Sequence, residues 1–259
     1  MTITENHAGH VVLDDVRKTY AGGVDAVAGV SLDVSPGEFV AIVGASGCGK
    51  STVLRMLAGF ETVTSGTATV GGRQVTRPGP DRGVVFQDYG LFPWLTVAEN
   101  VRYGLRQRGI TRGIARSRAA EYIALVGLER FADRFPGQLS GGMQQRVAIA
   151  RVLANEPSVL LMDEPFGALD ALTRTQLQHE LHRIVGETGT TVLFVTHSIE
   201  EAVYLSDRVV VMTGGASHGV PGSIARVVPV ELGVDRDVNA ADFNALEREI
   251  AALVHEPVG

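Results

Sequence analysis

The sequence predicts an α/β fold, in which strands and helices alternate along a chain of 259 residues. Short apolar runs are separated by turns rich in glycine, which occurs 31 times, and this pattern is typical of such folds. The run Phe39–Val43 is apolar throughout, as expected of a strand buried on both faces, and a predicted helix, Lys50–Ala58, follows it. From about Val97 to Phe135 the apolar periodicity becomes helical. We therefore expect one α/β domain that carries a helical insert.

The other elements are predicted from apolar runs bounded by turn residues. Strands are expected at Val11–Val16, Val30–Val34, Thr67–Val70, Val84–Phe86, Val159–Met162, Thr191–Val195, Val209–Met212 and Ile224–Val228. A loop is expected at Tyr20–Gly29, and a polar, mobile loop at Gly214–Gly222. Further helices are expected from Ser140 on, near Asp170–Glu187, at Ile199–Leu205, and around an apolar stripe of Phe243, Leu246, Ile250 and Leu253.

Composition and charge narrow the range of functions. The net charge of −6 argues against general nucleic-acid binding, which favours a basic domain. The apolar runs are too short to span a bilayer, and the N-terminal residues lack the layout of a signal peptide, so we expect a cytoplasmic protein. The single cysteine, Cys48, excludes an internal disulfide and a multi-cysteine metal site.

One basic stretch stands out from the acidic whole. We expect a solvated face near a partner or an anionic membrane surface, with a nucleic-acid site as the weaker alternative. The stretch consists of Arg102, Arg106, Arg108, Arg112, Arg116 and Arg118.

The segment Gly44–Ser51, hereafter the phosphate cradle, reads GASGCGKS and matches the phosphate-binding pattern G-x-x-x-x-G-K-[ST] in full. Its glycines let backbone N–H groups turn toward phosphates, and the following helix N-terminus favours an anion. Lys50 should reach the β- and γ-phosphates of ATP, and Ser51 should ligate Mg²⁺. We expect nucleotide contacts from Gly44, Ala45, Ser46, Gly47, Cys48, Gly49, Lys50, Ser51 and Thr52.

Two carboxylates follow the apolar strand Val159–Met162. Asp163 is predicted to hold Mg²⁺, and Glu164 is predicted to polarise the water that attacks the γ-phosphate. The alternative for such a pair is a helix N-cap. The phosphate cradle elsewhere in the chain favours the catalytic interpretation.

The segment Leu139–Arg146 reads LSGGMQQR and resembles the LSGGQ signature of the ABC ATPase family. The resemblance implies a P-loop NTPase with a mixed sheet core, N-terminal antiparallel strands and a helical subdomain insert. It also implies that the signature contacts ATP held by a second ATPase subunit, in a dimer that is expected to be a homodimer. The residues assigned to this contact are Ser140, Gly141, Gly142 and Gln145. Met143 stands where the consensus has Gln, so no polar role is expected there.

The resemblance extends to other elements in the expected order. Tyr20 is implied to stack on adenine, although it could be an ordinary half-buried Tyr. Gln87 is implied to approach Mg²⁺ and the attacking water. His197 is implied to contact the γ-phosphate, the alternative being an incidental histidine. The family's D-loop corresponds to Ala168–Leu169–Asp170, which places Asp170 at the nucleotide interface.

The resemblance also implies an organisation and partners. One ABC ATPase domain is expected over 11–250, with a core at about 11–95 and 156–230, a helical subdomain at about 96–155, and a C-terminal helical extension at 231–259. The segments Gln87–Val101, Met162–Arg174 and Val195–Met212 are similar to the nitrate, sulfonate and taurine importer family. This implies two transmembrane permease subunits, a periplasmic or extracellular solute-binding protein, and a peripheral location on the cytoplasmic face of the inner membrane. The alternative is an ABC ATPase of a soluble assembly or cofactor-building complex.

Aromatic residues cluster just after Gln87. An exposed aromatic group there would suit a partner helix, whereas the alternative is a small local core of the helical insert. The cluster consists of Tyr89, Phe92, Pro93 and Trp94.

Overall fold

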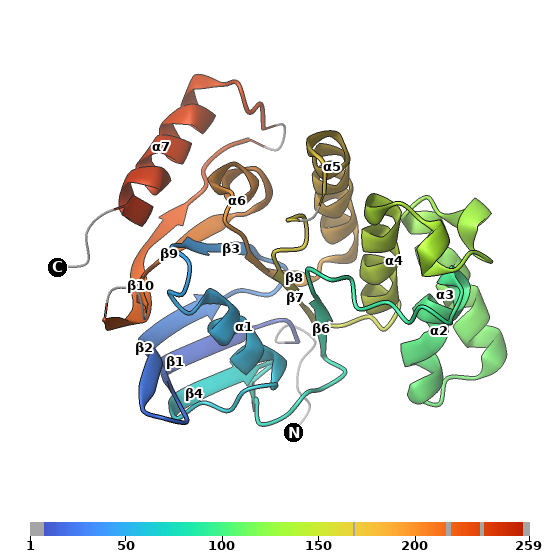
Figure 1. The fold of residues 1–259 in the computed structure, drawn as a ribbon, viewed down its shortest axis with the longest axis horizontal. Coiled ribbons are helices and arrows are strands. Elements are labelled where there is room, and N and C mark those ends of the chain that lie inside the picture. The colour runs from blue at the N-terminus through green and yellow to red at the C-terminus, as the bar shows by residue number, and fades with distance from the viewer. Residues whose placement is uncertain (1–7, 168, 216–218, 234–235, 256–259) are drawn as a thin grey trace.

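The computed structural model describes residues 8–167, 169–215, 219–233 and 236–255, which form a ten-stranded mixed sheet flanked by helices (Figure 1). The strands are β1 (Val11–Tyr20), β2 (Val24–Val34), β3 (Phe39–Gly44), β4 (Ser65–Val70), β5 (Arg73–Gln74), β6 (Arg82–Val85), β7 (Val159–Asp163), β8 (Thr191–Val195), β9 (Arg208–Gly215) and β10 (Val220–Pro229). The α-helices are α1 (Lys50–Ala58), α2 (Val97–Gln107), α3 (Arg112–Leu125), α4 (Gly141–Leu153), α5 (Ala171–Thr188), α6 (Ile199–Leu205) and α7 (Ala241–His255). Two 3₁₀ turns lie at Glu129–Phe131 and Pro136–Gln138.

The strand order is β5-β4-β1-β2-β10-β9-β3-β8-β7-β6. The strands β9, β3, β8, β7 and β6 are parallel, whereas β1, β2, β4 and β5 pair antiparallel to one another. The two parts meet at β10, which is antiparallel to β9 and pairs with β2 at Gly222 and Val27. The predicted mixed sheet with antiparallel N-terminal strands is therefore confirmed.

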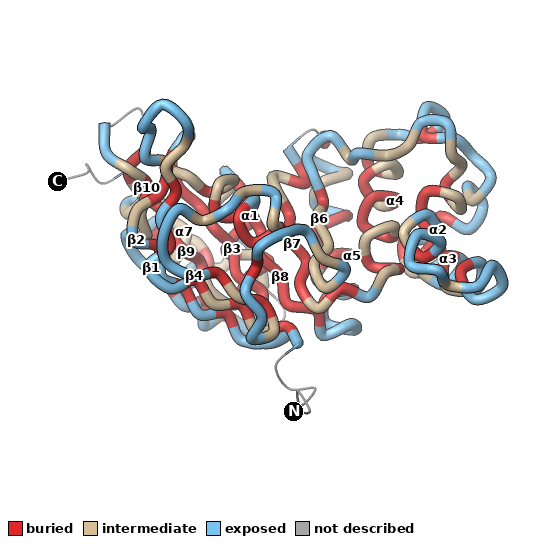
Figure 2. The backbone as a smooth tube through the Cα atoms, turned by 90° about the horizontal axis from the view of Figure 1, so that it is seen from below, coloured by how far each residue is buried: buried red, intermediate tan, exposed pale blue. Residues whose placement is uncertain are grey.

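Alternate residues of β3 supply two hydrophobic cores on opposite faces of the sheet. Phe39, Ala41 and Val43 pack in the core formed with helices α2 to α7, whereas Val40 and Ile42 pack in the core formed with α1. Helix α1 lies between the parallel strands and the layer of β1, β2 and β4, which bends beneath it (Figure 1). All six residues of β3 are buried, as expected of a central strand (Figure 2).

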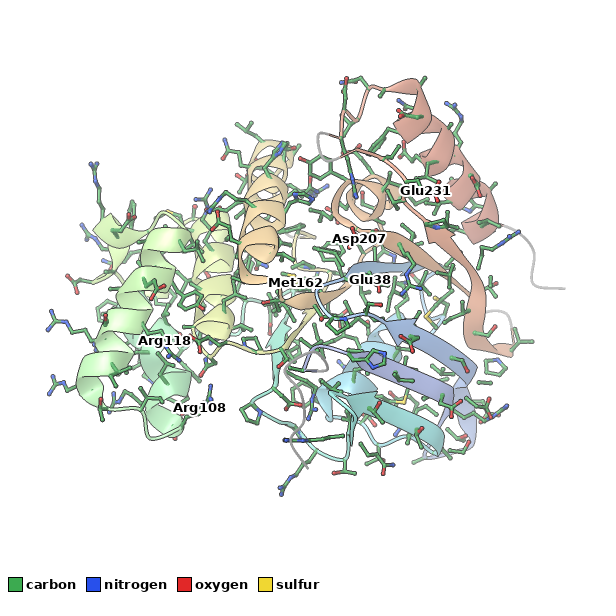
Figure 3. The ribbon with its side chains drawn as sticks, turned by 180° about the vertical axis from the view of Figure 1, so that it is seen from behind. Glu38, Arg108, Arg118, Met162, Asp207 and Glu231 are labelled. Carbon is green, nitrogen blue, oxygen red and sulfur yellow. The ribbon has the colours of Figure 1, made fainter. Side chains whose placement is uncertain are left out.

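The start of β3 is tied to the start of β9 by charged side chains. The Asp207 carboxylate accepts a hydrogen bond from the Phe39 N–H at 2.8 Å, and the Arg208 guanidinium pairs with Glu38. Figure 3 labels Asp207 and Glu38 close together at this point, with Met162 of β7 nearby in the centre. These contacts fix the strand that leads into the phosphate cradle.

Helices α2, α3 and α4 form a lobe at the side of the sheet, hereafter the helical lobe (Figure 1). Thr96 and Glu99 form a capping box at the start of α2, since the Glu99 N–H donates to the Thr96 hydroxyl and the Thr96 N–H donates to the Glu99 carboxylate. The buried Asn100 amide donates to the Phe92, Leu95 and Thr96 carbonyls. Hydrogen bonds from the Asn100 side chain therefore hold the segment before α2 against that helix.

The basic stretch is less free than the sequence indicates. Arg102 pairs with Glu99 at 3.2 Å, and Arg118 pairs with Glu156 at 3.2 Å. Arg108 donates to the Asn155 carbonyl at 2.6 Å. Figure 3 shows Arg108 and Arg118 on the helical lobe. Several of these arginines thus brace the lobe internally.

The chain after β9 completes the sheet and adds α7, which packs against α6, β9 and β10 (Figure 1). Phe243 and Ile250 are the buried residues of the predicted apolar stripe. Arg236 donates to the Val203, Tyr204 and Ser206 carbonyls at the end of α6, so it caps that helix.

Two expected loops are wrong in extent. Strand β1 runs on to Tyr20 and β2 begins at Val24, so most of Tyr20–Gly29 is strand. The glycines of this segment, Gly22, Gly23 and Gly29, indicate a loop, but only Gly22 and Gly23 lie in the turn, whereas Gly29 lies within β2. The expected loop Gly214–Gly222 is largely hairpin, with β9 ending at Gly215 and β10 beginning at Val220. Its residues 216–218 lie outside the described part of the chain. No helix among the described residues is long and apolar enough to cross a membrane.

Candidate functional site

The phosphate cradle connects β3 to α1 through backbone conformations that favour glycine. Gly44, Gly47 and Gly49 have φ values of 150°, 81° and 96°. A Cβ on Gly44 would lie 2.3 Å from the Met212 carbonyl oxygen, and one on Gly49 would lie 2.7 Å from Val27. Side chains at these positions would displace neighbouring strands, so the loop can close tightly only with glycine.

Lys50 folds its side chain into the cradle. Its ammonium donates to the Gly44 carbonyl at 2.8 Å and to the Ala45 carbonyl at 3.0 Å, and the residue is only 5% exposed. Helix α1 begins here with no side-chain cap and no acidic residue in its first turn. The cation and the helix N-terminus therefore converge on one small region, which suits a phosphate group.

Ser51 and Asp163, each expected to ligate Mg²⁺, lie in contact at the sheet edge. The Ser51 hydroxyl donates to the Asp163 carboxylate at 3.0 Å, from the first turn of α1 to the end of β7. A hydroxyl and a carboxylate are the oxygen ligands that Mg²⁺ prefers. These two residues therefore fit a magnesium site.

Glu164 and His197 are in direct contact, with 2.7 Å between His197 Nε2 and Glu164 Oε1. Both side chains are partly exposed, at 47% for His197 and 28% for Glu164. Glu164 adopts a left-handed backbone with φ 49°, and its N–H donates to the Val195 carbonyl at 2.9 Å. Such strain in a residue other than glycine is typical of functional sites.

Gln87 and Tyr20 border the site from two other elements. A Cβ on Gly167 would lie 3.2 Å from the Gln87 amide nitrogen, so Gln87 adjoins the loop that follows Glu164. The Tyr20 hydroxyl lies 3.4 Å from the Thr52 hydroxyl, which sets its ring beside α1. The Lys18 ammonium lies 4.9 Å from the Tyr20 ring centroid. Tyr20 is thus positioned at the rim of the cradle.

The signature segment lies on a different part of the chain surface. Exposed Ser140 caps α4 by accepting a hydrogen bond from the Met143 N–H at 3.3 Å. A Cβ on Gly142 would lie 2.3 Å from Thr173, so glycine is needed for α4 to approach α5. Figures 1 and 2 both show β6 and β7 between α1 and α4. No hydrogen bond or ion pair joins Ser140 to the cradle among the described residues.

Gln145 is fully buried, and neither its amide nitrogen nor its amide oxygen has a hydrogen-bond partner in the described part of the chain. Its assignment to nucleotide binding stays a prediction. Exposed Asp170 caps α5, and hydrogen bonds from the Thr173 N–H and hydroxyl lower the pKa of its carboxyl group. The D-loop prediction includes Ala168, which lies outside the described residues.

Cys48, which lies within the cradle, is fully buried. Burial raises the pKa of its thiol, although the Lys50 ammonium nearby opposes this shift. The interpretation of Cys48 as a small filling residue is the one that the packing favours.

The hairpin of β9 and β10 also adjoins the cradle, a contact that no sequence motif predicts. A Cβ on Gly215 would lie 2.4 Å from the Gly47 carbonyl oxygen, and one on Gly222 would lie 1.8 Å from the Cys48 carbonyl oxygen. The hairpin therefore packs its backbone directly on the cradle. The glycines of 214–222 were the available signal, but they also suit an ordinary loop.

Comparisons with known proteins agree with this geometry. The family model described as ABC transporter matches residues 27–167. An uncharacterized ABC transporter ATP-binding protein of Methanocaldococcus jannaschii is 49% identical over 91% of this chain and 86% of that protein. The nitrate import ATP-binding protein NrtD of Synechocystis is 44% identical over 93% of this chain and 90% of that protein.

The bicarbonate transport ATP-binding protein CmpC of Synechococcus elongatus is 48% identical over 85% of this chain, which spans 34% of that longer protein. A solved dimeric structure of an ATP-binding cassette in a post-hydrolysis state, bound to ADP and phosphate, aligns with a TM-score of 0.72. Its sequence identity is 36%, and the alignment covers 86% of this chain and all of that one. The chain belongs to the ABC transporter family and is an ATP-binding subunit that hydrolyses ATP.

Proposed function

We propose that two copies of this chain bind two ATP molecules between them and energise an importer of a small oxyanion. Nitrate and bicarbonate, which the names of two relatives contain, are both small planar oxyanions. The earlier expectation also included sulfonates and taurine. The subdomain division at about 96–155 and the C-terminal extension from 231 belong to the same proposal.

The observation that carries the catalytic proposal is the 2.7 Å contact between Glu164 and His197 at the sheet edge that also holds Asp163. Glu164 is the general base or water-orienting group, because its carboxylate is partly exposed and faces an imidazole. Lys50 and His197 stabilise charge on the γ-phosphoryl group, and Gln87 orients the water.

Ser51 and Asp163 would hold Mg²⁺, with Gln87 near it. The ion, when bound, neutralises charge on the phosphate oxygens. Tyr20 would stack on adenine, since its ring lies beside the α1 residue Thr52.

The dimer follows from the separation of the two anion sites. The signature offers the Ser140 hydroxyl and the first N–H groups of α4, but it lies away from the cradle of its own chain. A second copy, oriented head to tail, would bring Ser140, Gly141 and Gly142 to the γ-phosphate. The dimeric solved cassettes support this arrangement.

Glu164→Gln tests the catalytic proposal. We expect ATP binding to remain, a closed dimer to accumulate with ATP, and turnover to fall by about 100-fold or more, as for loss of a general base. Phosphate release measures turnover, and light scattering measures the dimer. The matched control is Glu200→Gln, an exposed carboxylate on α6, which should hydrolyse ATP normally. Near-normal turnover of Glu164→Gln would refute the role.

A permease is proposed to dock on the aromatic group after Gln87. Trp94 is 70% exposed, and its ring lies 5.6 Å from that of Phe92, which in turn lies 4.6 Å from Tyr103. The Arg151 guanidinium lies 5.6 Å from the Phe92 ring centroid. A cavity of about 440 Å³ beside them is lined by Gly90, Phe92, Tyr103, Arg108 and Arg151. This hollow, with apolar and cationic walls, suits a short amphipathic helix of a membrane partner.

Purification from detergent-solubilised membranes tests the partner. We expect a permease to co-purify with the wild type and with Phe131→Ala, an exposed aromatic change elsewhere on the helical lobe, but to be lost with Trp94→Ala. Vesicles carrying the complex and its solute-binding protein would then be tested for uptake of nitrate and bicarbonate. Recovery with soluble assembly factors alone would favour the cofactor-building alternative.

A further inference from the structure

A chain of polar contacts, buried at Glu201 and Thr196 and partly exposed at Arg174, joins the loop before α5 to the residues that flank His197. We propose that Arg174 and Glu201 are positioning residues that couple the D-loop to His197 during ATP hydrolysis. The inference rests on the function proposed above for His197 and Asp170, and it adds two residues to which no role has been assigned.

The first part of this chain of contacts fixes the backbone on both sides of His197. The Thr196 hydroxyl donates to the Glu201 carboxylate at 2.5 Å, and it accepts a hydrogen bond from the Ser198 N–H at 3.0 Å. Thr196 is 3% exposed and Glu201 is 6% exposed. The residues before and after His197 are therefore tied to one hydroxyl, which Glu201 holds in place.

The second part reaches the D-loop through the first turn of α5. The Arg174 guanidinium donates from Nη2 to the Leu169 carbonyl at 3.0 Å, immediately before Asp170. The buried Gln178 lies one turn later on α5. The Arg174 guanidinium thus lies between Glu201 of α6 and the Leu169 carbonyl.

The link between the two parts is not fully closed. Arg174 Nε lies 3.7 Å from Glu201 Oε1, beyond hydrogen-bond distance. The same Nε is buried and has no hydrogen-bond partner among the described residues. A relative shift of about 0.5 Å would bring this donor within reach of the carboxylate. Closing the contact would give this buried donor an acceptor, so a displacement of Leu169 and Asp170 that moved Arg174 toward Glu201 would act on Thr196 through the Glu201 carboxylate.

This arrangement has a consequence for the proposed dimer. The D-loop is expected at the subunit interface, whereas His197 contacts Glu164 of its own chain. Arg174 and Glu201 would therefore transmit a movement at the dimer interface to His197, which is proposed to contact the γ-phosphate. Neither residue touches ATP in this scheme, so they should affect turnover more than ATP binding.

Kinetic analysis of Arg174→Ala and Glu201→Gln tests the proposal. We expect kcat to fall about tenfold or more in each variant, while KM for ATP stays within about twofold of the wild type, as for an interaction lost only in the transition state. The double variant should be no slower than either single variant, because one coupling is lost once. Arg174→Lys should remain slow, since a single ammonium cannot reproduce the guanidinium fork toward Leu169 and Glu201.

The matched control is Arg183→Ala, on the same helix, which removes an exposed ion pair with Glu187 at 2.8 Å and a hydrogen bond to the Leu125 carbonyl at 3.0 Å. This variant should have wild-type kcat. Its melting temperature shows how much stability is lost when an arginine is removed from α5. Normal kcat in Arg174→Ala, parallel rises in KM, or additive losses in the double variant would each overturn the proposal. Glu164→Gln keeps the two failures apart: if it is inactive while Arg174→Ala is normal, only the coupling is wrong.

Discussion

Phe166 is expected to be the main anchor of the loop that carries Glu164. The residue is fully buried, and its ring lies 5.7 Å from Phe194 of β8, whose ring lies 5.8 Å from Phe39 of β3. A buried aromatic side chain removes about 200 Å² from water, which at about 25 cal/mol per Å² amounts to about 5 kcal/mol. The unfolded chain already buries part of that area, so Phe166→Ala should cost about 3–5 kcal/mol.

The cost can be measured as a shift in melting temperature. A domain of this size loses about 2–4 °C per kcal/mol, so Phe166→Ala should melt about 6–20 °C below the wild type. Phe166→Leu keeps most of the volume and loses chiefly the ring contacts, at about 1–1.5 kcal/mol, or about 2–6 °C. Circular dichroism melts of the three proteins give both values. If the two variants melt together, or the alanine variant falls by less than about 3 °C, the anchoring role is refuted.

Three further predictions concern Cys48 and the two residues of the α2 capping box. Because Cys48 is buried and burial raises the pKa of its thiol, a maleimide should label it slowly in the folded protein at neutral pH and fully in urea; equal rates would contradict the packing. Thr96→Ala should lower stability by about 1 kcal/mol, measured by urea unfolding. The pKa of Glu99 is lowered, chiefly by the hydrogen bond from the Thr96 N–H. The advantage of wild type over Glu99→Gln should therefore be present at neutral pH and disappear as the pH falls through the lowered pKa; an advantage that persists in acid would exclude the charge as its source.

Elements with strong local signals were predictable from the sequence. The bounds Lys50–Ala58 of α1 and Ile199–Leu205 of α6 are confirmed, and so is β8 at Thr191–Val195. Glycine punctuation and continuous apolar runs identify such elements without tertiary information. The predicted end of strand β1, at Val16, is four residues too early because the strand is irregular. Asp15 has φ 43°, and the register with β2 shifts after Leu13. A bulge breaks the two-residue period by which strands are identified.

Some residues of the candidate site belong to recognisable sequence motifs, whereas others join the site only through contacts between distant parts of the chain. The cradle, the carboxylates after β7 and the signature are short motifs with their own meaning, and the structure brings Ser51 to Asp163 and Glu164 to His197. The contact of Gly222 with Cys48 joins residues far apart in sequence, and no motif encodes it. Arg174 and Glu201 also match no phosphate-binding pattern. Only the structure, which places their side chains near each other, indicates a shared role.

The spacing between Glu164 and His197 is set by the sheet more than by side-chain packing. Asp163 pairs with Val195 as the last residue pair between β7 and β8, and the Glu164 N–H extends this ladder by donating to the Val195 carbonyl. His197 follows two residues after Val195, the last residue of β8. The left-handed backbone of Glu164, at φ 49°, is thus held by the hydrogen bond that its N–H donates to β8, the strand that leads to His197. A substitution that shifts the register of β7 against β8 would separate the Glu164 and His197 side chains. Substitutions of exposed residues on the following helices, α5 and α6, should leave this contact intact.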